Sequence, residues 1–460
     1  HLARWLHLSL EALYFAAVSL SIAALVGSLC GFAKAFLAHV SEQRLAFLLT
    51  LSSGPGWLIL FLQALFPGIS WLTRYKWAFD RPEVNTFLLF SSAPHLPLSL
   101  ALLLWLVAAY WRQGDAESRI SPSRLILCAV TVVAIGLLNP FCLAPLFALL
   151  GLAWIWRFVE SRRCSWPYTL SLGLLGLVAL PLLVYNFWIF TFDPFWGRTY
   201  GTQNYQASYP VDVRLLGYGV TAFLAALGIA AVWRHKPEGR YLTLSAVVLF
   251  LMGYLPTTYQ RRFSFGLAPL LAVLAVPGWQ WLASREWMRR LRSVSGGRII
   301  GSVLLFLLLW GQNLSYAVLY GASYLGTGPT DRYVFQPRTL KTIATYLYDY
   351  GESAVVLTCE ETGNMLAGEI RGRVVLGHAG ATIDVDRRRE EIQAFFGGAL
   401  TPAECTDLLL RYGVTHVVVS PLDPHCDRLL PDPEWETIIS EGDYQLFSVV
   451  RSVASMSAVW

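Results

Sequence analysis

Residues 125–158, LILCAVTVVAIGLLNPFCLAPLFALLGLAWIWRF, contain two apolar runs that are separated only by Asn139-Pro140-Phe141. An apolar helix of roughly 20 residues crosses a hydrocarbon core about 30 Å thick. Because proline removes an amide donor and clashes with the preceding turn, Pro140 forbids a continuous helix. The whole stretch is also too long for a single crossing. It therefore predicts two membrane spans, 125–138 and 142–158, that are joined by a tight turn.

Apolar runs of this kind recur through most of the chain. Its residues are 55% hydrophobic and only 14% charged, whereas about a quarter of a soluble domain is charged. We predict about ten transmembrane helices: 9–37, 45–66, 86–110, 125–138, 142–158, 167–190, 213–233, 241–259, 263–283 and 299–320.

Charge divides the chain into two parts. Residues 1–329 hold 24 basic and 11 acidic residues, whereas residues 330–460 hold 11 basic and 19 acidic residues. We therefore predict a transmembrane domain over 1–325 and a water-soluble domain over 330–460. The positive balance of the first part reflects arginine clusters in loops beside a lipid bilayer. It does not indicate a nucleic-acid partner.

The distribution of arginine and lysine predicts the orientation. Loops 38–44, 111–124, 157–166, 234–240 and 284–298 together carry 15 of these residues, and the alternate loops carry 6. The richer set is expected in the cytoplasm. We thus predict a multi-pass protein of a bacterial cytoplasmic membrane, with loops 67–85 and 191–212 and the C-terminal domain on the outside.

The C-terminal part alternates short apolar runs with helical patterns. The predicted strands are 354–357, 374–376, 417–419 and 446–450, and the predicted helices are 386–396 and 402–412. This alternation predicts a small α/β domain with a mainly parallel sheet. The domain contains neither a GxGxxG nor a Walker sequence, so no nucleotide site is indicated.

The cysteine and histidine residues of this domain give little information about its function. Cys359, Cys405 and Cys426 share a compartment, so one disulfide can form among them, but its pairing is not determined by the sequence. They have no CxxC spacing, and we expect no metal site. His378 follows a predicted strand, where α/β sheets bind ligands, although a structural turn is the default role for a lone histidine between glycines.

Two acidic residues in loop 67–85 are candidates for catalysis. Asp80 or Glu83 could act as a general base, or could bind a divalent cation that bridges to a phosphate. The alternative is that both carboxylates form local ion pairs in a solvated loop. The sequence identifies no other cofactor.

Arg261 and Arg262 lie in the turn between two predicted spans and are candidates for binding a lipid phosphate. A guanidinium offers a planar fork of donors that suits phosphate oxygens. The alternative is that both arginines extend to lipid headgroups. The preceding Tyr259 and Gln260 are candidates for binding substrate.

Three more residues are candidates for binding substrate. Loop 191–212 is rich in aromatic and amide side chains, and its residues Arg198 and Tyr200 could hold a sugar. The alternative is the belt of Trp and Tyr at any membrane interface. His95, within the third predicted span, could move a proton or could pack between helices with a hydrogen bond.

Several short motifs resemble the GT-C superfamily of membrane glycosyltransferases, especially its bacterial, dolichyl-phosphate-mannose-transferase-like branch. They run from about residue 40 to residue 385. The motifs are Arg44 with Leu51-Ser52-Ser53-Gly54-Pro55-Gly56-Trp57, Pro82-Glu83 with Phe87 and Pro94-His95, Asn139-Pro140-Phe141, Gln260-Arg261-Arg262-Phe263, and Leu376-Gly377-His378 with Thr382.

The resemblance implies an enzyme that moves a sugar from a polyprenyl-phosphate carrier to an acceptor on the outer face of the membrane. In this superfamily the catalytic acid lies in the first outer loop, which here would precede His1, and Glu11 is a poor substitute. We therefore expect either a preceding helix and loop, or a relative without catalysis. The latter would be a scaffold that docks a membrane-protein partner. Transport is a weaker third expectation, since no inverted repeat is visible.

Overall fold

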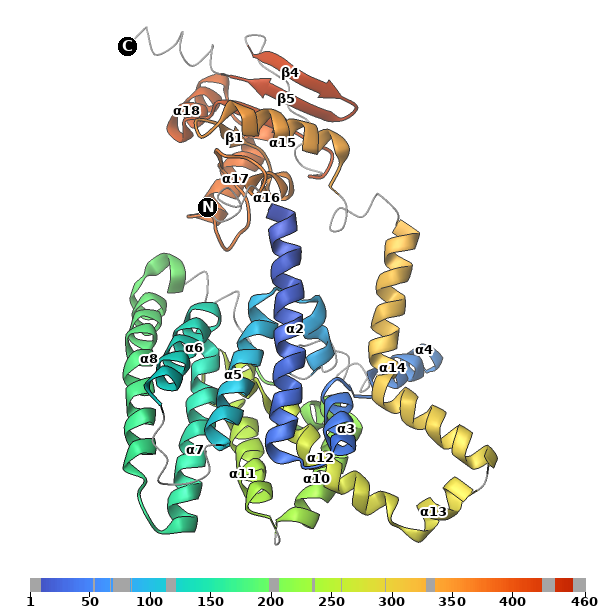
Figure 1. Cartoon of the computed structure of the whole chain (residues 1–460). Coiled ribbons are helices and arrows are strands. Elements are labelled where there is room, and N and C mark those ends of the chain that lie inside the picture. The colour runs from blue at the N-terminus through green and yellow to red at the C-terminus, as the bar shows by residue number, and fades with distance from the viewer. Residues whose placement is uncertain are drawn as a thin grey trace. The chain divides into compact units, whose positions relative to one another are not determined.

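The computed structural model describes residues 10–52, 54–66, 68, 83, 85–112, 121–197, 207–233, 236–257, 259–293, 295–327, 336–423 and 435–449. The chain divides into two compact units, a helical unit of His1–Asp193 and Asn204–Val318 and a C-terminal unit of Leu319–Trp460 that also includes Pro194–Gln203. Figure 1 shows both, and each is treated separately below. The helical unit and the sheet of the C-terminal unit confirm the predicted fold class.

Helices account for nearly all of the first unit. In chain order they are α2 (Leu10–Phe36), α3 (Val40–Thr50), α4 (Gly56–Leu65), η2 (Thr86–Ser91), α5 (His95–Trp111), α6 (Pro122–Leu138), η3 (Pro140–Cys142), α7 (Leu143–Ser161), α8 (Trp166–Phe192), α10 (Val211–Val232), α11 (Pro237–Met252), η4 (Gln260–Ser264), α12 (Leu267–Ala283), α13 (Glu286–Ser293) and α14 (Ser295–Thr327). In Figure 1, α6, α7 and α8 stand side by side, and α2 lies along α5.

Six helical segments of the described chain are long and apolar enough to cross a membrane: Ala12–Phe36, Pro140–Ser161, Trp166–Phe192, Val211–Val232, Gln260–Ala283 and Ile299–Val318. The helices α5, α6 and α11 are shorter, with 17, 17 and 16 residues. At 1.5 Å per residue such helices approach the thickness of the hydrocarbon core without exceeding it. The chain is therefore a multi-pass membrane protein.

The predicted span 45–66 is wrong as a single helix. It consists of α3 and α4, which are separated by residues 51–55. Pro55 has no amide hydrogen to continue the helix, and it stands between two glycines. The chain is held at this break by a hydrogen bond of 2.7 Å between the hydroxyl groups of Ser52 and Thr221.

Two glycines bring α10 and α12 into backbone contact. A Cβ atom on Gly228 would lie 1.8 Å from the carbonyl oxygen of Leu274, and one on Gly278 would lie 1.9 Å from that of Leu224. Small residues at such a crossing allow helices in a membrane to pack closely. Nearer its start, α10 is kinked at Gly219, whose φ of 53° and ψ of −133° favour glycine.

Two arginines donate hydrogen bonds to the last carbonyl groups of α5, which have no hydrogen-bond partner inside the helix. Arg124 Nη2 donates to the carbonyl oxygen of Ala109 at 2.9 Å. Arg157 Nη2 donates to those of Tyr110 at 3.0 Å and Trp111 at 2.7 Å. Cations also favour the negative end of a helix dipole. Both arginines belong to the loops predicted to face the cytoplasm, so they stabilise a helix end in addition to any effect on orientation.

The C-terminal unit has a five-stranded sheet with the order β2-β1-β3-β5-β4. Its elements are α15 (Arg338–Tyr350), β1 (Val355–Leu357), α16 (Glu360–Ala367), β2 (Arg373–Val374), α17 (Val385–Phe396), α18 (Pro402–Tyr412), β3 (His416–Val419), β4 (Glu436–Glu441) and β5 (Tyr444–Ser448). Apolar residues of α15 and α16 pack on one face of the sheet, and those of α17 and α18 pack on the other.

The prediction of a mainly parallel sheet is wrong. β1 pairs in parallel with β2 and β3, whereas β5 is antiparallel to both β3 and β4. The reason is a hairpin between β4 and β5, whose turn contains Gly442 at a φ of 58°. Only half of the strand pairs therefore have the parallel arrangement that alternating helices impose.

Cysteine pairing in this unit is partly settled. Cys359 is disulfide-bonded, and its partner lies outside the described residues. Cys405 is a free thiol. One disulfide among the three cysteines was the expectation, and Cys405 is excluded from it.

His416 should make the stability of the C-terminal unit depend on pH. Its side chain is fully buried, its Nδ1 is 2.8 Å from the hydroxyl of Thr415, and desolvation lowers its pKa to about 4 from the usual 6.5. Between these two pH values the unfolded chain binds a proton that the folded chain does not. The free energy of unfolding should thus fall by about 3 kcal/mol as the pH drops from 6.5 to 4.

Hydrogen exchange of peptides from β3 and β5 in the full chain, corrected for intrinsic rates, measures this loss. His416→Gln should flatten the pH dependence. His378→Gln, which changes an exposed histidine of the same unit, should leave it unchanged. A wild-type unit as stable at pH 4.5 as at pH 7 would contradict the prediction.

Candidate functional site

The candidate site lies at one end of the helical unit, where α5, α7, α10 and α12 begin and α6 and α11 end. The 3-10 helix η4 (Gln260–Ser264) connects α11 to α12 at this end. Gly266, with a φ of 96°, then turns the chain into α12. This short connection fixes Arg261 and Arg262 against the surrounding helix ends.

Arg261 is buried, with 8% of its surface exposed. Its Nη1 donates to the hydroxyl of Tyr209 at 2.8 Å, and its Cζ lies 5.2 Å from the centre of that ring. Its Nε has no hydrogen-bond partner, and within the described part of the chain no carboxylate forms an ion pair with it. Burying a cation without an anion is costly. Among the described residues, the buried polar contact of this guanidinium is therefore the hydroxyl of Tyr209 and not a carboxylate.

Arg262 brings three of the sequence motifs together. Its Cζ lies 5.6 Å from the ring centre of Phe141, in the turn between α6 and α7. It also acts electrostatically on His95, the first residue of α5, and on Cys142. The predicted candidates Arg262 and His95 and the Asn139-Pro140-Phe141 turn are thus neighbours in space, although they are far apart in the sequence.

Tyr259 and Gln260 support the same region. The ring of Tyr259 lies 4.8 Å from that of Phe141 and 6.1 Å from that of Phe190. Gln260 Oε1 accepts a hydrogen bond of 2.9 Å from the backbone of Ser208. Tyr259 therefore packs against the turn between α6 and α7. The side-chain carbonyl group of Gln260 is hydrogen-bonded to Ser208, which precedes α10 in the chain. The carboxamide nitrogen of Gln260 is not used in that contact.

Glu83 is a buried carboxylate, with 8% of its surface exposed. The side-chain atom Oε2 has no hydrogen-bond partner. The backbone carbonyl oxygen of Glu83 accepts a hydrogen bond of 3.4 Å from the hydroxyl of Tyr218. A buried carboxylate oxygen without a hydrogen bond is destabilising, which singles out Glu83 among the described acidic residues of this unit. Of the two acidic candidates, only Glu83 lies within the described residues. Asp80 lies outside them, as do Arg198 and Tyr200.

Arg214 is a buried guanidinium that the sequence reasoning missed. It lies in the first turns of α10 with 3% of its surface exposed, and its Nη1 donates to the carbonyl oxygen of Phe250 at 2.9 Å. Its Cζ lies 4.6 Å from the ring of Phe250 and 5.1 Å from that of Tyr254. A Cβ on Gly253 would lie 2.2 Å from Nη1, so a larger residue there would displace the guanidinium from this position. An arginine inside a predicted span was the available signal.

The two buried guanidinium groups are linked through tyrosines. The hydroxyl of Tyr254, which lies against Arg214, donates to the carbonyl oxygen of Tyr209 at 2.9 Å. The hydroxyl of Tyr209 in turn accepts from Arg261. Arg214 also acts electrostatically on Tyr218, as does Glu83. The arrangement joins two cations and one carboxylate at a single end of the helical unit.

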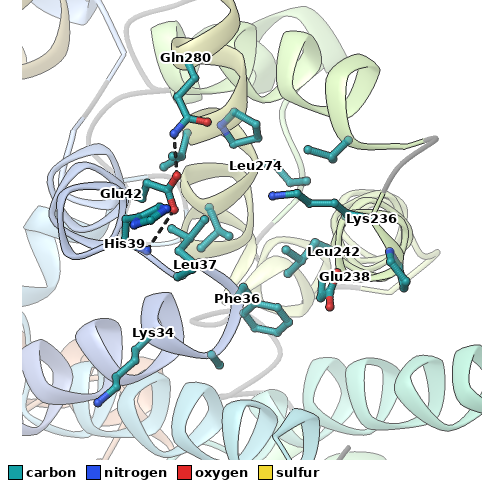
Figure 2. Close-up of a pocket in the computed structure, with 18 of the residues that line it drawn as sticks. Lys34, Phe36, Leu37, His39, Glu42, Lys236, Glu238, Leu242, Leu274 and Gln280 are labelled. Atoms are coloured by element: carbon teal, nitrogen blue, oxygen red, sulfur yellow. Dashed lines mark hydrogen bonds between the residues drawn. The ribbon is translucent and has the colours of Figure 1, made fainter.

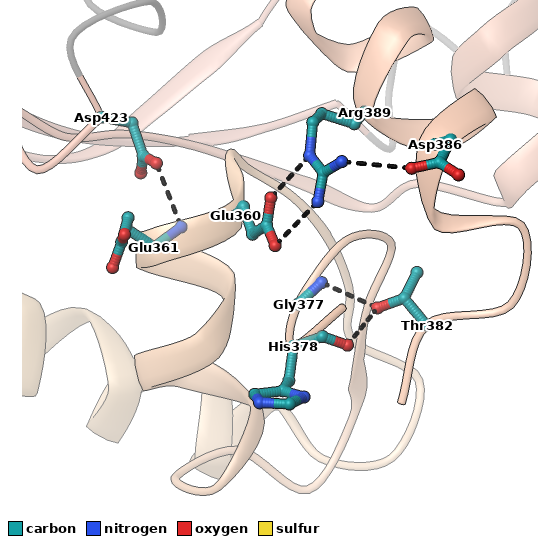
Figure 3. Close-up of polar contacts among 8 residues, drawn as sticks. All are labelled: Glu360, Glu361, Gly377, His378, Thr382, Asp386, Arg389 and Asp423. Carbon is teal, nitrogen blue, oxygen red and sulfur yellow. Dashed lines mark hydrogen bonds and ion pairs between the residues drawn. The ribbon is translucent and has the colours of Figure 1, made fainter. Parts of the chain in front are cut away.

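In the C-terminal unit the usual anion position of an α/β sheet is already filled. The backbone amides of Glu361 and Thr362, at the start of α16, donate to the carboxylate of Asp423 at 3.0 and 3.1 Å. The hydroxyl of Thr362 donates to the same group at 2.7 Å. Figure 3 shows Asp423 at the backbone of Glu361. A helix N-terminus that would attract a phosphate thus holds the chain's own carboxylate.

His378 belongs to a structural turn. Its Nδ1 accepts from the backbone of Gly380 at 3.0 Å, and the hydroxyl of Thr382 donates to its carbonyl oxygen at 3.2 Å. In Figure 3 its ring points away from the neighbouring Glu360, whose carboxylate is held by Arg389 through bonds of 2.7 and 3.1 Å. The turn, rather than a ligand site, accounts for this motif.

The described residues contain no recognisable metal site. Among the described residues, no group of three or more His, Cys, Asp or Glu side chains could hold a metal ion. Asp80 or Glu83 was predicted to bind a cation, and Asp80 lies outside those residues. A divalent cation therefore stays a prediction.

No family model and no curated protein matches the chain. It is similar to solved structures of the oligosaccharyltransferase of Archaeoglobus fulgidus. The apo form has a TM-score of 0.45 and 12% identity over 87% of this chain and 57% of that chain. The complex with Zn and sulfate has a TM-score of 0.46 and 11% identity over 87% and 55%. The complex with an inhibitory peptide and a dolichol-phosphate has a TM-score of 0.40 and 12% identity over 87% and 57%.

The chain thus spans a little more than half of the length of these structures. These TM-scores are all below 0.5, so the likeness identifies neither the family nor the activity of this chain.

Proposed function

We propose that the chain is a membrane glycosyltransferase that moves a sugar from a polyprenyl-phosphate carrier to an acceptor on the outer face of a bacterial cytoplasmic membrane. The observation that carries the proposal is Arg261, a buried guanidinium with an unused Nε donor and no described carboxylate partner. A phosphate on a membrane lipid is an anion that arrives at this depth and matches the planar donors of arginine.

In the proposed reaction, the oxygen of the acceptor attacks the anomeric carbon of the sugar. The bond between that carbon and the phosphate oxygen breaks, and its electron pair leaves with the phosphate. Arg261 and Arg262 stabilise the negative charge that develops there, which lowers the barrier. Glu83 is the described carboxylate best suited to take the proton of the acceptor, because it is buried close to Tyr218 and its Oε2 is not used.

The remaining assignments follow from this proposal. The transmembrane domain, residues 1–325, would hold the lipid-linked donor beside His95, Tyr259 and Gln260. The C-terminal domain, residues 330–460, would lie outside the cytoplasm and contact the acceptor, with Arg198 and Tyr200 nearer the sugar. A non-catalytic scaffold that docks a membrane protein is the alternative, but it gives no reason to bury Arg261 without a carboxylate partner among the described residues.

Binding of the carrier tests the proposal without requiring an acceptor. The full chain in detergent should be stabilised against heat by a polyprenyl phosphate, because a ligand that binds only the folded state raises its stability. The matched polyprenol, which has the same apolar chain and no phosphate, should have little effect. Equal stabilisation by both compounds would show that only the apolar chain is bound, and would contradict the proposal.

A further inference from the structure

A buried pair of asparagines joins α14 to the segment that follows Glu83. The side chains of Asn85 and Asn313 have only 0% and 2% of their surfaces exposed. Asn85 Nδ2 donates a hydrogen bond of 2.9 Å to Asn313 Oδ1. Asn85 Oδ1 accepts one of 3.1 Å from the backbone of Phe87, at the start of η2. Both polar atoms of the Asn85 side chain are therefore engaged, which fixes its orientation.

Asn313 also reaches the end of α3. Its Nδ2 donates a hydrogen bond of 2.7 Å to the carbonyl oxygen of Leu51. In a continuous helix this carbonyl would accept from the residue four positions later, which is Pro55 and has no amide hydrogen. Asn313 thus replaces the hydrogen bond that the proline removes. A single amide of α14 links the end of α3 to the start of η2.

Further contacts set the position of α14 beside these segments. The Nε1 of Trp57 in α4 donates to a backbone carbonyl of α14 at 2.8 Å, and the two helices are neighbours in Figure 1. A Cβ on Gly311 would lie 2.4 Å from that nitrogen, so a larger residue would displace the indole. One turn before Asn313, the ring of Trp310 lies 6.3 Å from that of Phe87. The asparagine pair is therefore part of a packed contact.

The same contact restricts Glu83. Glu83 lies two residues before Asn85, so their α-carbon atoms are at most about 7 Å apart. The hydroxyl of Tyr218 in α10 donates to the backbone carbonyl oxygen of Glu83 at 3.4 Å. The backbone of this segment is thus held by α10 at Glu83 and by α14 at Asn85. A buried polar network whose members are paired makes such a segment rigid.

We propose that Asn313 is a positioning residue for Glu83, and that it acts through Asn85. The inference rests on the proposed function, in which Glu83 takes the proton of the acceptor, and it assigns no chemistry to Asn313 itself. Asn313 lies in the apolar span Ile299–Val318, where a polar side chain usually bonds across helices. If the pair only anchored α14, its loss would lower stability without any effect that depends on Glu83.

The test is a double-mutant cycle on the full chain, with the turnover number and the KM for a polyprenyl-phosphate-linked sugar as readouts. Asn313→Ala should lower the turnover number by about ten- to a hundred-fold, because a reacting group is displaced, and should leave the KM unchanged. In a chain that already carries Glu83→Gln, Asn313→Ala should have no further effect, since residues that act as one unit are not additive.

Two further variants separate the bonds of Asn313. Asn313→Asp keeps the acceptor for Asn85 and loses the donor to Leu51, so it should retain more of the turnover than Asn313→Ala. Asn85→Ala removes the bond between the asparagines from the other side and should reproduce the loss caused by Asn313→Ala. It also provides the same comparison with Glu83→Gln where Asn313→Ala does not fold.

Gln280→Ala is the matched control. Gln280 Nε2 donates to Glu42 Oε1 at 2.7 Å, so it also joins two helices, α12 and α3, through a side-chain amide (Figure 2). Gln280 is exposed and lies at the end of α12, whereas the candidate site lies at the start of that helix. Its replacement should leave the turnover number unchanged.

Three results would overturn the proposal. Asn313→Ala with wild-type turnover beside a slow Glu83→Gln would refute the positioning role and leave the proposed function standing. An equal loss from Asn313→Ala with and without Glu83→Gln would show that Asn313 acts independently of the carboxylate. A fully active Glu83→Gln would instead remove Glu83 from the proposed reaction, and the positioning role with it.

Discussion

Replacing Arg261 by alanine is expected to reduce the turnover number of sugar transfer by about a hundred- to a thousand-fold, as does the loss of one donor to a developing oxyanion. Arg261 is buried against Tyr209 and has an unused donor. Arg261→Lys keeps the charge but loses the planar fork, so it should restore only part of the activity. Turnover of a polyprenyl-phosphate-linked sugar by the full chain is the measurement.

Arg285→Ala is the matched control, because Arg285 is also stacked on an aromatic ring but is exposed. It should leave turnover unchanged. The wild type and the Arg261→Ala variant should have similar melting temperatures once the phosphate carrier is absent. Arg261→Ala with wild-type turnover would show that this arginine only contacts lipid, and would remove the main support for the proposed function.

Replacing Glu83 by glutamine is expected to change activity and stability in opposite directions. If Glu83 takes the proton of the acceptor, turnover should fall by about a hundred- to ten-thousand-fold. At the same time the variant removes a buried carboxylate with an unpaired Oε2, so the free energy of unfolding should rise by about 1–3 kcal/mol. Turnover and resistance to heat, measured on the same preparation, test both effects.

Glu238→Gln provides the comparison, since Glu238 is an exposed glutamate at the start of α11. Glu238→Gln should change neither the turnover nor the free energy of unfolding by much. A Glu83→Gln variant that is both fully active and no more stable would show that Glu83 is neither the base nor a strained group. A variant that is more stable and fully active would assign the strain to Glu83 but the proton transfer to another residue.

Some features of the site could be predicted from the sequence because they depend on chain connections. Pro140 had to end a helix, and two basic residues in a short connection had to lie at a membrane boundary. The contact of Arg262 with Phe141 and its effect on His95 could not be predicted, because they depend on which helix ends meet. Helix packing, which is not encoded in local spacing, decides those neighbours.

Arg214 shows why the rest was missed. Within the sequence it reads as one charge near the start of an apolar span, and nothing there indicates Phe250 or Tyr254 as its neighbours. The break of the second predicted span was missed for a different reason. Apolar residues continue on both sides of Pro55, so hydropathy alone joins α3 and α4. In the C-terminal domain, the polar strand β4 lacks the apolar alternation by which the other strands were found.

The kink at Gly219 divides α10 into two segments that make different contacts. The longer segment contacts α12 through the backbone at Gly228 and Gly278. Its position is therefore fixed by backbone contacts and not by side-chain conformations. The shorter segment carries Arg214 and Tyr218, and its direction is set by the backbone of a single glycine. A straight helix would aim these two side chains elsewhere. The direction of the segment that carries Arg214 and Tyr218 therefore depends on the backbone of one glycine, and not on the contact that holds α10 to α12.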